Sequence, residues 1–317
     1  MDKKRYQREM DRISMSPAFR AALTEAMAGE KPARRPRRAW RTALLAAALC
    51  GALAVSALAL SPTLRQALED ALGGYAQYAR PVDGAAVSNG AELRVVSALN
   101  GGSILKVYAE VRGLEEQKLG DLQPICGILA PTGEGAETGG GSTSGGEWVG
   151  YDPESGTALV EFSAWGLPIR SGDRLRLTAV IPAPPGQLSL LYEWHIEFAV
   201  EELPVRSIPL SGTIGDTPLL RAEISALGVT LYSGGRETIA GYPLAVCCED
   251  GSVLTPVYEG GGSTGDTRLT CWEYDEPVEP ETITGLALGQ WYIPLEGDTA
   301  LPGRWLAALP AAGKNAG

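Results

Sequence analysis

The first 28 residues place apolar side chains three or four positions apart, as one face of a helix does. Ser16 and Pro17 predict where a second helix begins, because serine caps a helix and proline lacks an N–H that would stay unpaired there. The apolar positions are Tyr6, Met10 and Ile13 in the first predicted helix and Phe19, Leu23 and Met27 in the second.

Neither helix is long enough to be stable alone, because isolated helices shorter than about 12–15 residues are marginal in water. Their apolar faces therefore need a surface to cover them, and we expect a cytoplasmic protein to do so. Two alternatives stay open: the segment lies on the membrane, or it is a loose anchor without a partner.

Residues 42–60 contain no charged side chain and predict a transmembrane helix. A helix of this length spans about 28 Å, close to the thickness of a bilayer's hydrocarbon core. Basic residues crowd its N-terminal side, and Arg38, Trp40 and Arg41 are expected to anchor it at the interface. The positive-inside rule then places the N-terminus in the cytoplasm and the C-terminal part outside, at the cell membrane. A cleaved signal peptide and a buried globular helix are the alternatives.

Charge divides at the same place. Residues 1–42 hold twelve Lys and Arg against five acids, a net charge of +7. The remaining residues hold fifteen against thirty-three, a net charge of −18. This split favours two compartments, with the lipid bilayer as a partner of the basic stretch. An acidic domain of this kind is not expected to bind nucleic acid directly.

After the predicted span, Ser61 and Pro62 repeat the signal for a helix start, and Leu64, Leu68 and Leu72 form its apolar stripe. From about residue 89 the period changes to two, with turn residues between the segments. Trp194, Ile196, Phe198 and Val200 alternate with polar neighbours in one such segment. The predicted strands lie in ELRVVSAL, SILKVYAEVRG, GTALVEFSAW, DRLRLTAVI, YEWHIEFAV, PVRSIPL, PLLRAEISALGVTLYS, YPLAVCCED, SVLTPVYEG, TRLTCWEYD, TITGLALG and QWYIPL.

Strands at about ten-residue spacing, separated by Gly and Pro turns, are typical of β-sandwiches. The segment GGGST occurs at residues 139–143 and 260–264, each time before a strand, and we interpret both copies as flexible hairpin tips of two related domains. The predicted fold class is mainly β, with two immunoglobulin-like β-sandwich domains. The predicted divisions are 1–41 (cytoplasmic helices and basic linker), 42–60 (transmembrane helix), 61–84 (membrane-proximal helix and linker), 85–202 (first sandwich), 203–300 (second sandwich) and 301–317 (C-terminal tail).

The sequence predicts no active site, cofactor or metal site. The single histidine, His195, falls on the solvent face of its predicted strand. The acidic run from Glu273 to Glu281 lacks the spacing of a calcium loop and is expected to be a solvated loop. Cys247 and Cys248 point to opposite faces of a strand, so only one could pair with Cys271. The other interpretation is that these cysteines, with Cys126, are small buried hydrophobic residues.

The whole layout resembles a family of Gram-positive bacterial membrane proteins described as anti-sigma-factor-like, with immunoglobulin-like ectodomains. The resemblance rests on KKRYQREMDRISMSPAFRAALTEAM, the Arg-rich segment before one span, SPTLRQALEDALGGY, GAELRVVSAL, ILKVYAEVRG, WHIEFAV and TITGLALGQWYIPL. It implies that the cytoplasmic helices hold a sigma factor until an external event releases it. Residues 1–39 contain no His or Cys, so the chain departs from the zinc-binding type.

We therefore expect a single-pass membrane regulator whose outer domains bind an unknown extracellular ligand or envelope component. The alternative from another class is a cell-surface structural or adhesion protein, in which the N-terminus is only an anchor. A membrane-tethered hydrolase is a third hypothesis, but nothing in the sequence singles out its catalytic residues.

Overall fold

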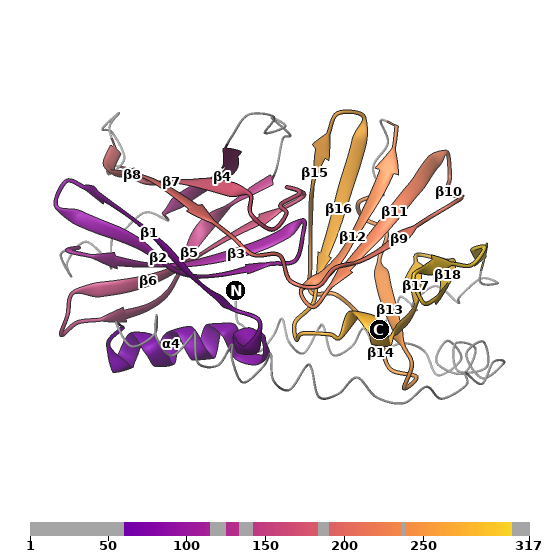
Figure 1. The fold of residues 1–317 in the computed structure, drawn as a ribbon, viewed down its shortest axis with the longest axis horizontal. Helices are drawn as coiled ribbons and strands as arrows, with labels where there is room; N and C mark the ends of the chain where they lie inside the picture. The colour runs from indigo at the N-terminus through magenta and orange to yellow at the C-terminus, as the bar shows by residue number, and fades with distance from the viewer. Residues whose placement is uncertain (1–59, 115–124, 133–141, 183–189, 236–238, 306–317) are drawn as a thin grey trace, which may run out of the picture.

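The computed structural model describes residues 60–114, 125–132, 142–182, 190–235 and 239–305. Within these residues the protein is mainly β, with sandwich-like sheets and one short α-helix (Figure 1). Two sheet domains lie side by side, and α4 (Pro62–Leu72) runs beneath the first of them. All strand pairs are antiparallel, as expected where hairpins connect successive strands.

The first domain is one eight-stranded sheet in the order β1-β2-β3-β6-β5-β4-β7-β8. The sheet curls so that its two edge strands meet: Ser88 Oγ accepts a hydrogen bond from the Glu193 amide at 3.0 Å. A side chain at Gly84 would press on Ile196, so the two edges also approach closely. The strands are β1 (Arg80–Ser88), β2 (Ala91–Asn100), β3 (Ile104–Arg112), β4 (Cys126–Thr132), β5 (Ser142–Asp152), β6 (Thr157–Trp165), β7 (Arg174–Pro182) and β8 (Leu190–Ala199).

The second domain packs two six-stranded sheets face to face. One has the order β10-β11-β12-β16-β15, with β9 beside β11; the other has β14-β13-β17-β18-β19, with β20 beside β18. The first sheet comprises β9 (Arg206–Pro209), β10 (Thr213–Ile214), β11 (Thr217–Ser225), β12 (Gly228–Gly234), β15 (Tyr258–Thr264) and β16 (Thr267–Glu273). The second comprises β13 (Leu244–Cys248), β14 (Val253–Leu254), β17 (Ile283–Leu288), β18 (Trp291–Glu296), β19 (Thr299–Ala300) and β20 (Arg304–Trp305).

Two 3₁₀ turns complete the described elements: η1 (Gly73–Gln77) follows α4, and η2 (Pro280–Thr282) precedes β17. Asn89 and Gly90 form the turn that joins β1 to β2, and both residues have positive φ, +47° and +83°. This is the geometry of a tight two-residue hairpin, which Asn and Gly tolerate best.

The structure corrects the interpretation of GGGST as hairpin tips. Residues 260–264 belong to β15 and pair with β16, and the turn follows at Gly265. Residues 142–143 likewise begin β5. Glycine weakens an isolated strand, but pairing with a strongly apolar neighbour such as β6 or β16 supplies the missing stability.

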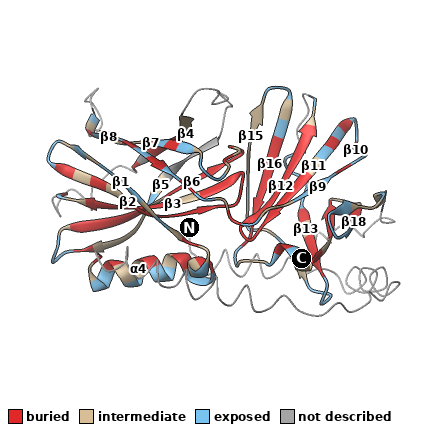
Figure 2. Cartoon of the chain, viewed as in Figure 1, coloured by how far each residue is buried: buried red, intermediate tan, exposed pale blue. Residues whose placement is uncertain are grey.

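Each domain has its own core. The first gathers the inward residues of all eight strands, including Phe162 and Trp194, and the second lies between its two sheets. A third apolar cluster lies under and between the domains, where α4 meets the outer face of β5 and β6. Figure 2 shows the buried side of α4 turned toward the sheet and its exposed side turned away.

Candidate functional site

The third cluster, which we call the junction, joins α4, η1 and both sheet domains. Its buried members include Ile104 and Trp165 from the first domain and Leu227 and Cys271 from the second. Apolar contact of this kind excludes water and resists separation of the parts. The remaining buried members are Leu60, Leu64, Leu68, Leu72, Tyr75, Ala79, Val96, Leu99, Tyr108, Leu159 and Leu203.

Helix α4 enters the junction as its sequence predicts. The Ser61 side chain accepts a hydrogen bond from the Leu64 amide at 3.3 Å, and Pro62 occupies the first turn. Leu64, Leu68 and Leu72 are its buried residues. The helix packs close against the sheet, so a side chain at Gly150 would collide with Ala67.

The segment after α4 reaches the second domain with two tyrosines. Tyr75 donates its hydroxyl to the backbone oxygen of Tyr274 at 2.9 Å, in a buried position. Tyr78 donates to a carboxylate oxygen of Glu279 at 2.6 Å. Burial, followed by the hydrogen bond to Glu279, raises the pKa of Tyr78 above its usual value, so the phenol stays a donor. One short segment thus contacts both domains.

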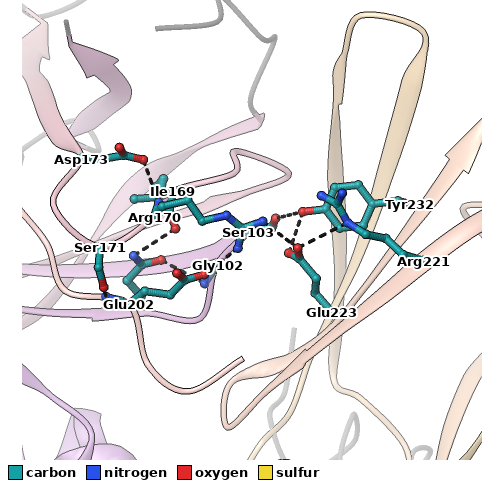
Figure 3. A network of polar contacts seen from close by, with 11 residues as sticks. Gly102, Ser103, Ile169, Arg170, Ser171, Asp173, Glu202, Arg221, Glu223 and Tyr232 are labelled. Carbon is teal, nitrogen blue, oxygen red and sulfur yellow. Dashed lines mark hydrogen bonds and ion pairs between the residues drawn. The ribbon is translucent and has the colours of Figure 1, made fainter. Parts of the chain in front are cut away.

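A first polar network crosses the junction through Arg170 (Figure 3). Arg170, in the loop between β6 and β7, contacts Glu202 and Glu223 at 2.6 Å each. Glu223 belongs to β11 of the second domain and its side chain is only 4% exposed. Burial alone would lower the pKa of Arg170, but the hydrogen bonds to Glu223 and Glu202 raise it. This pairing keeps a buried carboxylate compensated.

The same carboxylate is held on its other side by the second domain. Tyr232 donates its hydroxyl to Glu223 at 2.7 Å, and the Tyr232 hydroxyl also lies 2.9 Å from Ser103 Oγ of the first domain. The Arg221 guanidinium stacks over the Tyr232 ring at 3.7 Å and lies 3.4 Å from Glu223. Figure 3 shows these side chains converging from both domains. Stacking and hydrogen bonding together fix the orientation of the ring.

A second polar network surrounds Glu273 at the end of β16. Lys106 of β3 lies 2.5 Å from Glu273 and 3.3 Å from Glu161, and the Trp165 indole donates to Glu273 at 3.0 Å. Burial alone would lower the pKa of Lys106, but Glu273 and Glu161 outweigh it and raise the pKa. Two carboxylates and one ammonium thus hold the domains in register.

Glycines supply a third kind of contact. Gly166, with φ of +72°, ends β6 and touches the backbone of β15 at Gly261 and Gly262. Any side chain at Gly166 would collide with the Gly262 amide. The glycine run in β15 therefore lets two backbones meet where side chains would keep them apart.

The predicted partner-binding residues Tyr6, Met10, Ile13, Phe19, Leu23 and Met27 lie outside the described residues, as do Arg38, Trp40 and Arg41. Of the expected span, only Leu60 is described, and it is buried in the junction. None of the helices that the structure describes combines the length and the apolar character that crossing a bilayer requires.

His195 lies on the solvent face of β8, as its alternation predicted. Its side chain is 57% exposed and lies 3.2 Å from Glu193 and 3.1 Å from Thr178. No group of three or more His, Cys, Asp or Glu that could hold a metal occurs among the described residues. Thr178, His195 and Glu193 thus form a short row of polar contacts on the exposed face of β7 and β8.

The acidic run is divided by the structure. Asp275, Glu276, Glu279 and Glu281 are exposed, in agreement with a solvated loop. Glu273 is an exception, 6% exposed and paired across the junction. The prediction that Glu273 lies in a solvated loop is wrong, because the first domain covers this end of β16. The burial of Glu273 could have been predicted from its place in a strand, because residues two apart, such as Cys271 and Glu273, lie on the same face.

The described cysteines Cys247, Cys248 and Cys271 are free and buried. Cys248 packs in the second core while Cys247 packs outside it against Ala287 and Tyr292, so their opposite orientation is confirmed. Cys271 accepts a hydrogen bond from Thr230 at 3.4 Å within the junction. Burial raises the pKa of Cys271 to about 11. This supports the interpretation of small buried residues over a disulfide at Cys271. The Cys126 side chain lies outside the described part.

No protein-family model and no curated protein matches the chain. The chain is similar to a solved structure, "The crystal structure of the conserved domain protein from Bacillus anthracis", and the matched region covers 70% of this chain and 79% of that one. The two share 16% sequence identity and superpose with a TM-score of 0.46.

Proposed function

We propose that the chain is a single-pass membrane regulator of the anti-sigma type. Residues 1–41 lie in the cytoplasm, residues 42–60 cross the cell membrane, and the two domains, of immunoglobulin-like kind, lie outside. The role is non-catalytic. The partners are a cytoplasmic sigma factor, the lipid bilayer and an extracellular ligand or envelope component.

The observation that carries the proposal is the position of α4 and η1. They follow residue 60 directly and contact both domains, through Leu64, Leu68 and Leu72 on one side and Tyr75 and Tyr78 on the other. A change in the arrangement of the domains therefore acts on the segment that leads into the span. A simple anchor would not need this contact with two domains.

The cytoplasmic end supplies the output. Tyr6, Met10, Ile13, Phe19, Leu23 and Met27 form apolar faces that a sigma factor would cover. Arg38, Trp40 and Arg41 hold the span at the inner interface. Ligand binding to the outer domains can change the affinity for the sigma factor only if both sites share a conformational equilibrium. In this proposal, the contacts of α4 and η1 with both domains provide that coupling.

The test is affinity capture of the tagged full chain from membranes of its own host after mild detergent extraction. We expect a sigma factor to be retained, and to be lost when Phe19→Asp and Leu23→Asp are introduced together. The control carries Ala21→Asp and Thr24→Asp, which add the same charge away from that helical face.

The regulator hypothesis is supported if the wild type and the control capture the sigma factor and the Phe19→Asp, Leu23→Asp variant does not. Retention by all three chains, or by none, contradicts it. Deletion of residues 1–30 separates the adhesion alternative: an adhesin keeps its surface role after this deletion, whereas the regulator loses its effect on transcription.

A further inference from the structure

The second sheet of the second domain, which contains β13, β14, β17 and β18, carries apolar residues on both of its faces. One face packs against the second core. The opposite face carries a separate cluster, which we call the outer cluster. Figure 1 shows β17 and β18 at the end of the second domain away from the first. The buried members of the outer cluster are Cys247, Ala287 and Tyr292, and Ala245 and Val253 pack against them.

The outer cluster is buried more deeply than a face open to water would be. Cys247 is 0% exposed, Ala287 4% and Tyr292 5%. The Tyr292 ring lies across Gly285, since a side chain at Gly285 would collide with the ring and its hydroxyl. An aromatic ring that lies across a single sheet leaves its upper side open to solvent. An exposure of only 5% therefore indicates a further layer above the ring.

The course of the chain after β18 indicates which segment forms this layer. β19 pairs with the end of β18, and the Leu301 amide donates to the Pro294 oxygen at 2.9 Å. β20 then pairs with the start of β18, in a register that sets Arg304 beside Tyr292. The chain is thus held along the edge of β18 as far as Trp305, next to the outer cluster.

The sequence after Trp305 is compatible with burial on this face. Residues 306–309 read Leu-Ala-Ala-Leu, and residues 306–317, which lie outside the described residues, contain one charged side chain, Lys314. The inner face of the sheet is already filled by the second core. An apolar segment that leaves β20 therefore meets the outer cluster as the nearest apolar surface without a second layer among the described residues.

We propose that residues 306–309 dock on the outer cluster and form a third layer of the second domain. The partner of this surface is the chain's own segment after β20. Leu306 and Leu309 supply the apolar contact, and the small side chains of Ala307 and Ala308 let the segment lie close to the sheet. The inference goes beyond the proposed function and holds whether or not the chain binds a sigma factor.

The test is the rate at which a maleimide labels Cys247 in the reduced full chain in detergent micelles, with each cysteine read by peptide mass spectrometry. Deletion of residues 306–317 should raise this rate about tenfold or more, because burial of one leucine side chain already shifts an equilibrium by about that factor. Cys271 is buried in the junction, away from this face, and should stay protected in both chains. Its protection shows that the domains remain folded.

Two variants that keep the length of the chain locate the contact. Leu306→Ser with Leu309→Ser removes both large apolar side chains and should reproduce most of the effect of the deletion. Ala311→Ser with Ala312→Ser introduces two serines beyond Pro310, outside the docking segment. This control should change the Cys247 labelling rate by less than about twofold.

A Cys247 labelling rate that the deletion leaves unchanged, whether slow or fast, overturns the proposal. If the deletion also exposes Cys271, the two serine variants decide, and equal Cys247 rates in those two variants overturn it. Exposure of Cys247 after deletion of residues 1–30 would assign the cover to the N-terminal segment. Protection that is lost on dilution would assign it to a second copy of the chain. Either of these results also overturns the proposal.

Discussion

Two pairs of neighbouring strands, β7 with β8 and β3 with β6, belong to one sheet and face one core, yet they are buried in different ways. Along β7 and β8, buried and more exposed positions alternate almost without interruption. Along β3 and β6 nearly every position is buried. The difference lies on the outer face, which is open to solvent on β7–β8 and covered by α4 and the second domain on β3–β6.

Polar residues on the two outer faces therefore have different energetic weight. On β7–β8, Arg176 and Glu197 pair at the surface, with side chains about half exposed. On β3–β6, Lys106 and Glu161 pair in a setting from which most water is excluded, together with Glu273. Surface pairs contribute little, whereas breaking a buried pair leaves an uncompensated charge. The same alternation in sequence thus encodes a solvated face in one region and a domain contact in the other.

The largest expected effect comes from removing the buried carboxylate. Glu273→Ala should lower the free energy of unfolding by about 3 kcal/mol, because it removes the carboxylate that accepts from the Trp165 indole and leaves Lys106 with Glu161 alone. Glu197→Ala, on the exposed face of β8, should change the free energy of unfolding far less, because solvent screens this surface pair. Urea unfolding of the full chains in identical micelles measures both. Equal losses in the two variants would remove the distinction between the faces.

A smaller effect is expected from the helix that covers β5 and β6. Leu68→Ala should cost about 2 kcal/mol, the low end for a buried leucine, because a helix packed from one side can shift into the gap. Its control, Glu69→Ala, changes an exposed neighbour and should alter the unfolding free energy by less than about 0.5 kcal/mol. If both substitutions are neutral, α4 does not contribute to the junction in solution.

The smallest effect concerns pH on the exposed face. Hydrogen bonding to Arg176, and then its charge, hold the pKa of Glu197 below its usual value. Stabilisation from a lowered carboxyl pKa is present above the ordinary value, near 4.5, and is lost as pH falls through the folded value. Arg176→Gln should move the Glu197 titration upward, as measured by carbon-13 NMR of the carboxyl, with little change in stability at neutral pH. An unchanged titration would show that this surface pair is not formed.

How much the sequence predicts depends on the range of the interaction. Strand β8 and helix α4 follow from local patterns, since alternation fixes the face of Trp194 and a capping serine with a leucine stripe fixes the helix. Strand β1 was not predicted, because Pro81, Gly84 and two alanines weaken its pattern and pairing with β2 forms it.

The junction could not be predicted from local pattern, because its contacts join distant parts of the chain. Trp165 and Glu273 are 108 positions apart, and Tyr75 and Tyr274 are 199 apart. The glycines of β15 gave a signal that we interpreted as flexibility. Their role as a close backbone contact with Gly166 depends on a domain that sequence periodicity does not place.

The covered face of β3–β6 also has a consequence for biogenesis. The chain is made from its N-terminus, and domains generally fold in that order. The first domain therefore completes its sheet before β12 and β16 have been synthesised, and at that stage Ile104, Trp165 and Lys106 have no cover from the second domain. For this interval the nascent protein presents an apolar surface with a charge in its midst. Cellular quality control would meet this face, and docking of the second domain is the step that hides it.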